Sequence, residues 1–134
     1  MTKTYAVIGD PIDHSLSPAL FNAAFLFLQM DCAYIAYRIP KGDLAFGIDA
    51  LRKIGIAGFN VTIPHKIEMM RYLNEVDSEC KLVGATNTVV NDNGNLKGYN
   101  TDVSGFMSPI KNKKIDPKGS DVLLLGAGGA ARAI

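Results

Sequence analysis

Residues 121–134 read Asp121-Val122-Leu123-Leu124-Leu125-Gly126-Ala127-Gly128-Gly129-Ala130-Ala131-Arg132-Ala133-Ile134, and this stretch decides the fold class. The four apolar residues predict a buried strand, and the glycine-rich turn leads into residues that favour a helix. A strand, a glycine-rich turn and a helix in this order are the context of a dinucleotide-binding fingerprint. A tight turn in another kind of α/β protein can look the same, so this segment alone leaves both interpretations open.

The residues after the glycine-rich turn are too few to complete a nucleotide-binding domain. We therefore expect the chain to be the front part of a larger enzyme. A charged segment containing Pro117 and Gly119 predicts the domain boundary. We expect residues 1–112 to form a substrate-binding domain. Residues 113–134 are expected to form a linker, then the first strand and glycine-rich turn of a truncated dinucleotide-binding domain. In that case residues 122–134 lack a partner strand, and they stay unpaired or pair with another chain.

The composition indicates an ordinary globular domain. The 134 residues include 14 Lys and Arg against 13 Asp and Glu, which gives a net charge of +1. This balance does not favour a nucleic acid or a membrane surface as partner. The sequence has no apolar run near the roughly 20 residues of a transmembrane helix, and it opens without a signal-peptide pattern. We expect a cytoplasmic protein whose partner is a small molecule.

The cysteines and histidines do not form a metal-binding pattern. Cys32 and Cys80 lie far apart in the sequence without the spacing of metal ligands, and there are only two histidines. We expect both cysteines to be free thiols and no metal to be bound.

Short apolar runs alternate with segments of helical periodicity along the chain. The pattern predicts strands at residues 5–8, 33–39, 58–61, 86–91 and 96–99, and helices at residues 18–30, 44–54, 64–73, 75–83 and 102–110. Asn93-Gly94 between two apolar runs is typical of a β-hairpin. We therefore expect an α/β fold with a mostly parallel sheet flanked by helices and one antiparallel hairpin strand, followed by the start of a Rossmann domain.

Polar side chains collect where the predicted strands meet the following loops. Ligands of parallel α/β sheets bind at the carboxyl ends of the strands, so these positions are the candidate site. Hydroxyl, amide, ammonium and carboxylate groups together suit a small polyhydroxylated ligand. The residues are Ser15, Ser17, Asn60, Thr62, His65, Lys66, Thr86, Asn87, Thr88, Asn100, Thr101 and Asp102.

Each of these residues also has a purely structural explanation. Ser17 and Asp102 can cap helices, Thr62 can turn the chain, and Asn87 can end a strand. Lys66 is different, because a cation in the first turn of a helix is unfavourable beside the helix dipole.

Taken together, five segments resemble shikimate dehydrogenase, and they follow one another in the order of that family. They are Ser15-Leu16-Ser17-Pro18, Asn60-Val61-Thr62-Ile63-Pro64-His65-Lys66, Gly84-Ala85-Thr86-Asn87-Thr88, Gly98-Tyr99-Asn100-Thr101-Asp102 and Gly126-Ala127-Gly128-Gly129-Ala130. The resemblance implies an oxidoreductase that interconverts shikimate and 3-dehydroshikimate with NADP, a step in aromatic amino-acid synthesis. It also implies that the first domain of the family binds the substrate.

The resemblance assigns a role to each matching residue. The roles are carboxylate binding for Ser15 and Ser17, hydroxyl binding for Thr62, Asn87 and Asp102, proton transfer for Lys66 beside Asp102, and pyrophosphate binding for Gly126, Ala127, Gly128, Gly129 and Ala130. Reduction of a ketone needs a proton on its oxygen, and a lysine ammonium can donate that proton.

Several alternatives stay open at this stage. One is an enzyme that also accepts quinate, with NAD in place of NADP, because the residue that would read the cofactor ribose lies about 20 residues beyond the turn. Another is a ligand-binding module without catalysis. A homodimer is a further open alternative. We also expect this polypeptide alone to have no dehydrogenase activity.

Overall fold

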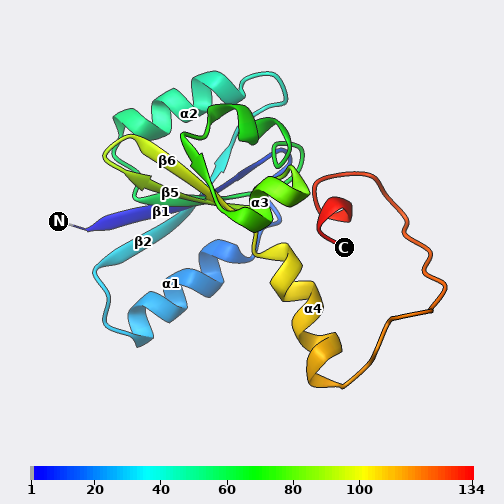
Figure 1. Ribbon diagram of the computed structural model, residues 1–134. Coiled ribbons are helices and arrows are strands. Elements are labelled where there is room, and N and C mark those ends of the chain that lie inside the picture. The colour runs from blue at the N-terminus through cyan, green and yellow to red at the C-terminus, as the bar shows by residue number, and fades with distance from the viewer. Residues whose placement is uncertain (1) are drawn as a thin grey trace.

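The computed structural model describes residues 2–134 and contains a six-stranded sheet with strand order β2-β1-β3-β5-β6-β4 (Figure 1). The strands are β1 (Lys3–Gly9), β2 (Cys32–Arg38), β3 (Gly58–Val61), β4 (Glu75–Val76), β5 (Thr88–Asp92) and β6 (Asn95–Tyr99). β1 pairs in parallel with β2 and β3, and β4 pairs in parallel with β6, whereas β5 is antiparallel to both of its neighbours. The predicted α/β sheet with one antiparallel strand is therefore confirmed.

Helices lie on both faces of this sheet. They are α1 (Ser17–Phe27), α2 (Leu44–Lys53), α3 (Ser78–Val83) and α4 (Asp102–Asn112), with short 3-10 helices η1 (Glu68–Tyr72) and η2 (Ala131–Ala133). Within residues 2–134 no helix is both long and apolar enough to cross a membrane.

Alternation along β1 separates two hydrophobic clusters. Ala6 and Ile8 are fully buried and pack with Leu44, Ile48 and Leu51 of α2. Their neighbours in sequence point to the other face, because successive strand residues alternate. There the smaller cluster joins Val7, Ile12 and Tyr34 to Tyr5, Phe21 and Phe25. The α2 face thus carries the main core, and the α1 face is thinly covered.

The prediction of a helix over residues 64–73 is wrong in its first half. Residues 62–67 form a turn that the His65 N–H closes by donating to the Thr62 carbonyl at 2.9 Å. The Lys66 carbonyl accepts from the Thr86 N–H at 2.9 Å. In an α-helix this carbonyl would instead accept from an N–H one turn further along the same segment. Only the five residues of η1 remain helical.

The prediction of a helix over residues 75–83 is wrong at its start. Glu75 and Val76 pair with Lys97 and Gly98 of β6. The Asp77 carboxylate then accepts from the Cys80 N–H at 2.7 Å and caps α3, so the helix begins at Ser78. Tertiary pairing and a local cap decide this boundary.

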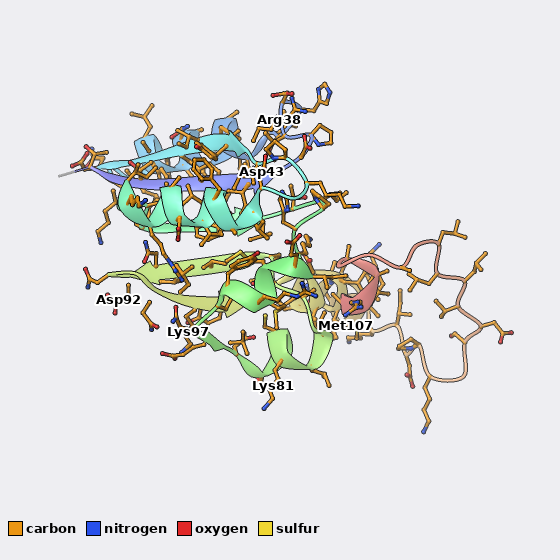
Figure 2. The ribbon with its side chains drawn as sticks, turned by 90° about the horizontal axis from the view of Figure 1, so that it is seen from above. Arg38, Asp43, Lys81, Asp92, Lys97 and Met107 are labelled. Atoms are coloured by element: carbon orange, nitrogen blue, oxygen red, sulfur yellow. The ribbon has the colours of Figure 1, made fainter. Side chains whose placement is uncertain are left out.

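The predicted strand over residues 122–125 does not form within the described part of the chain. Its side chains are 46–86% exposed, and the segment pairs with no strand among residues 2–134. An extended segment without a hydrogen-bonding neighbour does not become a strand. The chain loops away from the sheet after α4 and returns near α3 (Figure 1 and Figure 2), where Ala133 is 7% exposed.

Candidate active site

The direction of three strands gathers the candidate residues at one edge of the sheet. β3 and β6 are both antiparallel to β5, so their carboxyl ends meet the beginning of β5. Lys66 follows β3, Asp102 follows β6, and Asn87 directly precedes β5. The topology therefore brings an ammonium, a carboxylate and an amide from distant parts of the sequence to one place.

Lys66 and Asp102 form a direct ion pair. The Lys66 Nζ atom lies 2.7 Å from Asp102 Oδ2, and the side chains are only 16% and 28% exposed. A partly buried, hydrogen-bonded pair is less screened by water than an exposed one. Thr101 is the N-cap of α4, and the Asn100 side chain accepts from the Asp102 N–H at 3.0 Å, so capping does not account for the Asp102 carboxylate.

Asn87 joins this pair through its side-chain amide. Its Nδ2 donates to Asp102 Oδ1 and to Thr101 Oγ1, both at 2.8 Å, and its Oδ1 accepts from the Thr101 N–H at 3.0 Å. A backbone N–H can only donate, so this contact fixes which end of the amide faces Asp102. Both amide hydrogens are used, one by Asp102 and one by the Thr101 hydroxyl.

Ser15, Ser17 and Thr62 line a separate pocket of about 250 Å³ next to the sheet edge, together with Val7, Pro11, Ile12 and His14. The Ser15 hydroxyl accepts from the Ser17 N–H at 3.3 Å. The N-cap of α1 is Leu16, so capping by the Ser17 hydroxyl does not explain Ser17 either. The pocket lining does not include Lys66, Asn87 or Asp102; the turn of residues 62–67 connects the two groups.

Gly9 allows the loop that carries the serines to approach this turn. A Cβ atom at Gly9 would lie 2.5 Å from Thr62 Cγ2 and 2.8 Å from the Ile63 carbonyl oxygen. The Thr62 N–H also donates to the Ile8 carbonyl at 2.9 Å. The end of β1 and the turn after β3 are thus packed too tightly for a side chain between them.

The glycine-rich segment lies against Lys66. A Cβ atom at Gly129 would be 2.6 Å from the Lys66 Cβ, and Arg132 Nη1 is 3.1 Å from the Cβ position of Gly84. Gly126 has φ of +130°, a conformation suited to glycine. The structure therefore brings Gly129 to the aliphatic part of the Lys66 side chain, although the strand and the longer helix of a nucleotide-binding unit do not form in residues 121–134.

His65 is a positioning residue to which the motif pattern gave no role. It is fully buried, and its Nε2 lies 2.7 Å from the Ile39 carbonyl oxygen. A carbonyl only accepts, so Nε2 carries the hydrogen. This bond ties the turn that holds Lys66 to the end of β2. In the sequence, the only sign of this role is that a polar ring, His65, stands within a motif. The Ile39 carbonyl could not be predicted as its partner, because the tertiary fold brings the two together.

The two cysteines do not belong to this site. Both are free, and burial raises the pKa of the Cys80 thiol. The Cys80 Sγ lies 3.3 Å from the Ala85 carbonyl oxygen and 3.4 Å from Met70 Sδ. Within residues 2–134 there is also no group of three His, Cys, Asp or Glu side chains arranged for a metal ion.

An α/β sheet with a lysine–carboxylate pair and an oriented amide at its edge places polar groups where sheets of this class bind their ligands. The sequence model of the shikimate dehydrogenase substrate binding domain matches residues 7–89. The chain belongs to the shikimate dehydrogenase family.

Individual relatives agree with this assignment. The chain is 66% identical over 134 residues to the shikimate dehydrogenase (NADP(+)) of Nitrosopumilus maritimus and 49% identical over 135 residues to that of Bacillus cereus (strain G9842). In both cases the match covers 100% of this chain and 49% of the relative. The chain spans about half the length of these curated relatives.

Solved structures show the same fold. Shikimate dehydrogenase 1 from Peptoclostridium difficile superposes with a TM-score of 0.92 at 36% identity, covering 98% of this chain and 49% of that one. The shikimate 5-dehydrogenase of Thermus thermophilus, solved in complex with NADP(H) and shikimate, superposes with a TM-score of 0.87 at 38% identity, covering 99% and 50%.

Proposed function

We propose that this chain binds shikimate for its NADP-dependent interconversion with 3-dehydroshikimate, in the cytoplasm, as a step of aromatic amino-acid biosynthesis. The observation that carries the proposal is the Lys66–Asp102 pair at 2.7 Å, with Asn87 bound to the same carboxylate. The relatives from Nitrosopumilus maritimus and Bacillus cereus carry the name of this activity. Because the chain spans about half of each, the activity of the whole enzyme is part of the proposal.

Lys66 supplies the proton in this proposal. Reduction of the ketone adds a hydride to carbon and a proton to oxygen, and NADP in its reduced form supplies the hydride when bound. The Lys66 ammonium donates the proton to the oxygen, and in the reverse direction the amine takes it back. Asp102 holds the ammonium in place through its Oδ2. An ammonium without such a partner would sample several rotamers and lose the reactive geometry.

The two groups of polar residues divide the recognition of the ligand. Ser15 and Ser17 act as neutral donors to its carboxylate, and Thr62 lies in the same pocket to contact a hydroxyl. Asn87 and Asp102 receive the hydroxyls next to the reacting carbon. The 250 Å³ pocket and the ion pair are joined by one turn, which suits a compact ring with a carboxylate and hydroxyls.

The glycine-rich segment is proposed to bind the pyrophosphate of NADP. The close approach of Gly129 to Lys66 supports this, because the cofactor must lie beside the proton donor. We propose residues 1–112 as the substrate-binding domain and residues 113–134 as linker and first part of the nucleotide-binding domain. NADP, with no metal, is the proposed cofactor; nucleic acid and membranes are not proposed partners, and a homodimer stays open.

Calorimetric titration of the 134-residue chain with shikimate and with quinate tests the binding part. We expect shikimate to bind and Asn87→Ala or Asp102→Ala to remove detectable binding, whereas Lys81→Met, an exposed lysine on α3, leaves it unchanged. Quinate binding as tight as shikimate binding would favour the broader quinate/shikimate enzyme. Unchanged shikimate binding in both Asn87→Ala and Asp102→Ala would overturn the placement of the site.

A chimera tests the catalytic part. Residues 1–134 replace the matching half of the Nitrosopumilus maritimus relative, which is 66% identical over this length. We expect NADPH formation from shikimate, and a drop of at least roughly 10²-fold in kcat for Lys66→Met with little change in shikimate binding. Binding with full activity in Lys66→Met would reject the proton-transfer role, and binding without turnover in the wild-type chimera would favour a non-catalytic module.

A further inference from the structure

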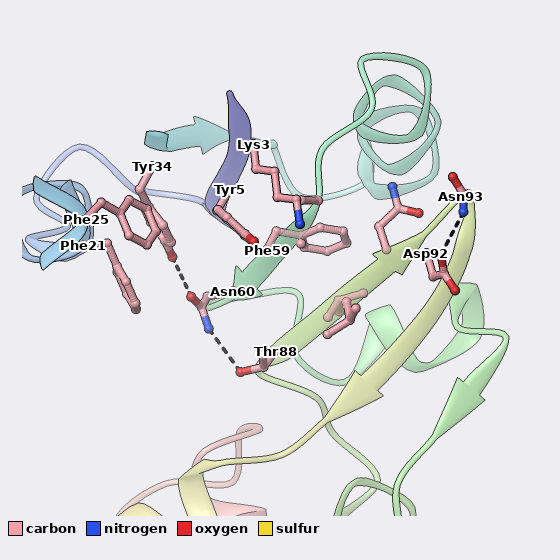
Figure 3. Close-up of a pocket in the computed structure, with 15 residues that line it drawn as sticks. Lys3, Tyr5, Phe21, Phe25, Tyr34, Phe59, Asn60, Thr88, Asp92 and Asn93 are labelled. Carbon is pink, nitrogen blue, oxygen red and sulfur yellow. Dashed lines mark hydrogen bonds between the residues drawn. The ribbon is translucent and has the colours of Figure 1, made fainter. Parts of the chain in front are cut away.

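Three polar side chains interrupt the apolar α1 face of the sheet. Tyr34, Asn60 and Thr88 line a groove of about 780 Å³ together with aromatic residues of β1 and α1. Figure 3 shows them joined by hydrogen bonds, Tyr34 to Asn60 and Asn60 to Thr88. Polar groups on an apolar face are costly unless they are paired, and these are paired with one another.

The strand register places them on one face of the sheet, in a row that steps two residues along β1 between Tyr34 and Asn60. Tyr34 of β2 lies opposite Tyr5 of β1, and Val7 of β1 lies opposite Asn60 of β3. Asn60 in turn lies opposite Thr88 of β5. Directly opposed residues share a face, so the row crosses four neighbouring strands on the α1 side. The Tyr34 hydroxyl spans β1 and reaches Asn60 Oδ1 at 2.6 Å.

The direction of each hydrogen bond in the row follows from its partners. Asn60 Nδ2 lies 3.3 Å from the Asn87 carbonyl oxygen, which only accepts, so Asn60 Oδ1 faces Tyr34 and the phenol must donate. Asn60 Nδ2 also donates to Thr88 Oγ1 at 3.1 Å, and the Thr88 hydroxyl donates to Asn87 Oδ1 at 3.0 Å. Burial raises the pKa of Tyr34 to about 12, so the phenol keeps its proton.

The row ends at the candidate active site. Asn87 donates to Asp102 Oδ1 at 2.8 Å, and Asp102 Oδ2 accepts from Lys66 at 2.7 Å. The row therefore includes one continuous series of hydrogen bonds donated from the Tyr34 hydroxyl through Asn60, Thr88 and Asn87 to the Asp102 carboxylate. Hydrogen bonds that are aligned in one direction polarise and strengthen one another.

We propose that Tyr34, Asn60 and Thr88 are positioning residues, which act through Asn87 to hold the Asp102 carboxylate and the Lys66 ammonium in their reactive orientation. α1 anchors the far end of the row: Phe21 stacks on the Tyr34 ring at a centroid distance of 4.4 Å, and Asn22 bonds to both the N–H and the carbonyl of Tyr34. The claim about reactivity rests on the proposed function, whereas the claim about Asn87 orientation does not.

NMR of the Asn87 side-chain amide in the 134-residue chain tests the structural claim directly. The resonances are assigned by their loss in Asn87→Ala. Tyr34→Phe and Thr88→Val each remove one hydroxyl with little change of shape, and we expect both to shift the Asn87 amide signals and speed their hydrogen exchange. Tyr5→Phe is the matched control, because Tyr5 lies opposite Tyr34 on the same face and its hydroxyl makes no hydrogen bond with any described residue. Unmoved Asn87 signals in both variants would overturn the proposal.

A double-mutant cycle tests the functional claim. We expect Thr88→Val to weaken shikimate binding about fivefold, Tyr34→Phe to weaken it less, and the double variant to be no weaker than Thr88→Val alone. In the active chimera, we expect Thr88→Val and Tyr34→Phe to lower kcat by a larger factor than they raise KM. A purely structural defect would not lower kcat selectively. Additive losses in the cycle, or losses equal to those of Tyr5→Phe, would reject the network. If the wild-type chain binds no shikimate, the proposed function fails, and the NMR result alone decides the network.

Discussion

At the scale of single residues, Gly9 controls the distance between the serine loop and the turn that leads to Lys66. In Gly9→Ala the new methyl group would meet a backbone oxygen at 2.8 Å as well as Thr62 Cγ2 at 2.5 Å, and the backbone oxygen cannot turn away. We expect a loss of about 1–3 kcal/mol in the free energy of unfolding, measured by urea titration, and weaker shikimate binding.

Gly105→Ala is the control for this prediction. Gly105 lies in α4, and a Cβ atom there would have no neighbour within 4 Å. The helix propensity of alanine is more favourable than that of glycine by about 1 kcal/mol, so we expect this variant to be as stable as the wild type or more stable. Equal stabilities of Gly9→Ala and Gly105→Ala would contradict the close approach.

Tyr34 gives a prediction about pH. Its pKa rises from 10.0 to about 12 on folding because burial disfavours the phenolate. A raised folded pKa contributes stability that is complete below pH 10 and is lost as the pH rises toward 12. We therefore expect the wild-type protein to lose about 2–3 kcal/mol more than Tyr34→Phe between pH 9 and pH 12. Parallel curves for the two proteins, from urea titrations at each pH, would show that Tyr34 is not the group responsible.

At the scale of single elements, α3 depends on Asp77, the residue that directly precedes it. The Asp77 carboxylate accepts from the Cys80 N–H at 2.7 Å, and helix caps of this kind contribute about 1 kcal/mol. Asp77→Ala should lower the free energy of unfolding by that amount. Asp43 occupies the same position before α2 without a capping hydrogen bond, so Asp43→Ala should change stability by less than about 0.5 kcal/mol. A thermal melt of each variant checks the pair.

The elements that the sequence predicted well are those whose signal is local. The continuous apolar run of β1, the periodicity of α2 and the Asn93-Gly94 turn each define their element without help from the rest of the chain. The segment around Pro64 and the segment around Glu75 failed because their backbone groups pair with Thr86 and with β6. The hydrophobic periodicity of a segment carries no information about partners so far away in the sequence.

The candidate site also contains residues that a local motif predicts and contacts that depend on the tertiary fold. Lys66, Asn87 and Asp102 were predicted from their motifs, and the strand directions explain why they meet. Asn60 was among the predicted candidates, but its hydrogen bond to Tyr34 was not predicted, because it requires the register of β2, β1 and β3 together. Tyr34 taken alone looks like an ordinary strand residue.

At the scale of the whole molecule, the sheet and the last part of the chain are nearly independent. Residues 111–128 are exposed throughout, whereas Gly129 lies against Lys66 and Ala133 is 7% exposed. Deletion of residues 115–134 should therefore leave a cooperative unfolding transition within about 1 kcal/mol of the full chain, as judged by urea titration. A broad transition would place the domain boundary elsewhere and contradict the proposed division at residue 113.

The reversed direction of β5 has a consequence for protein engineering. Asn87 stands at the beginning of a strand that is hydrogen-bonded on both sides, whereas Ser15 lies in a loop between β1 and α1. Under the proposed function, we therefore expect a library that randomises residues 13–16 to alter which acid binds while the amide, the carboxylate and the ammonium keep their places. Randomising residues 86–88 would instead disturb the sheet itself. The loop that carries Ser15 can thus be varied separately from the strand that holds Asn87.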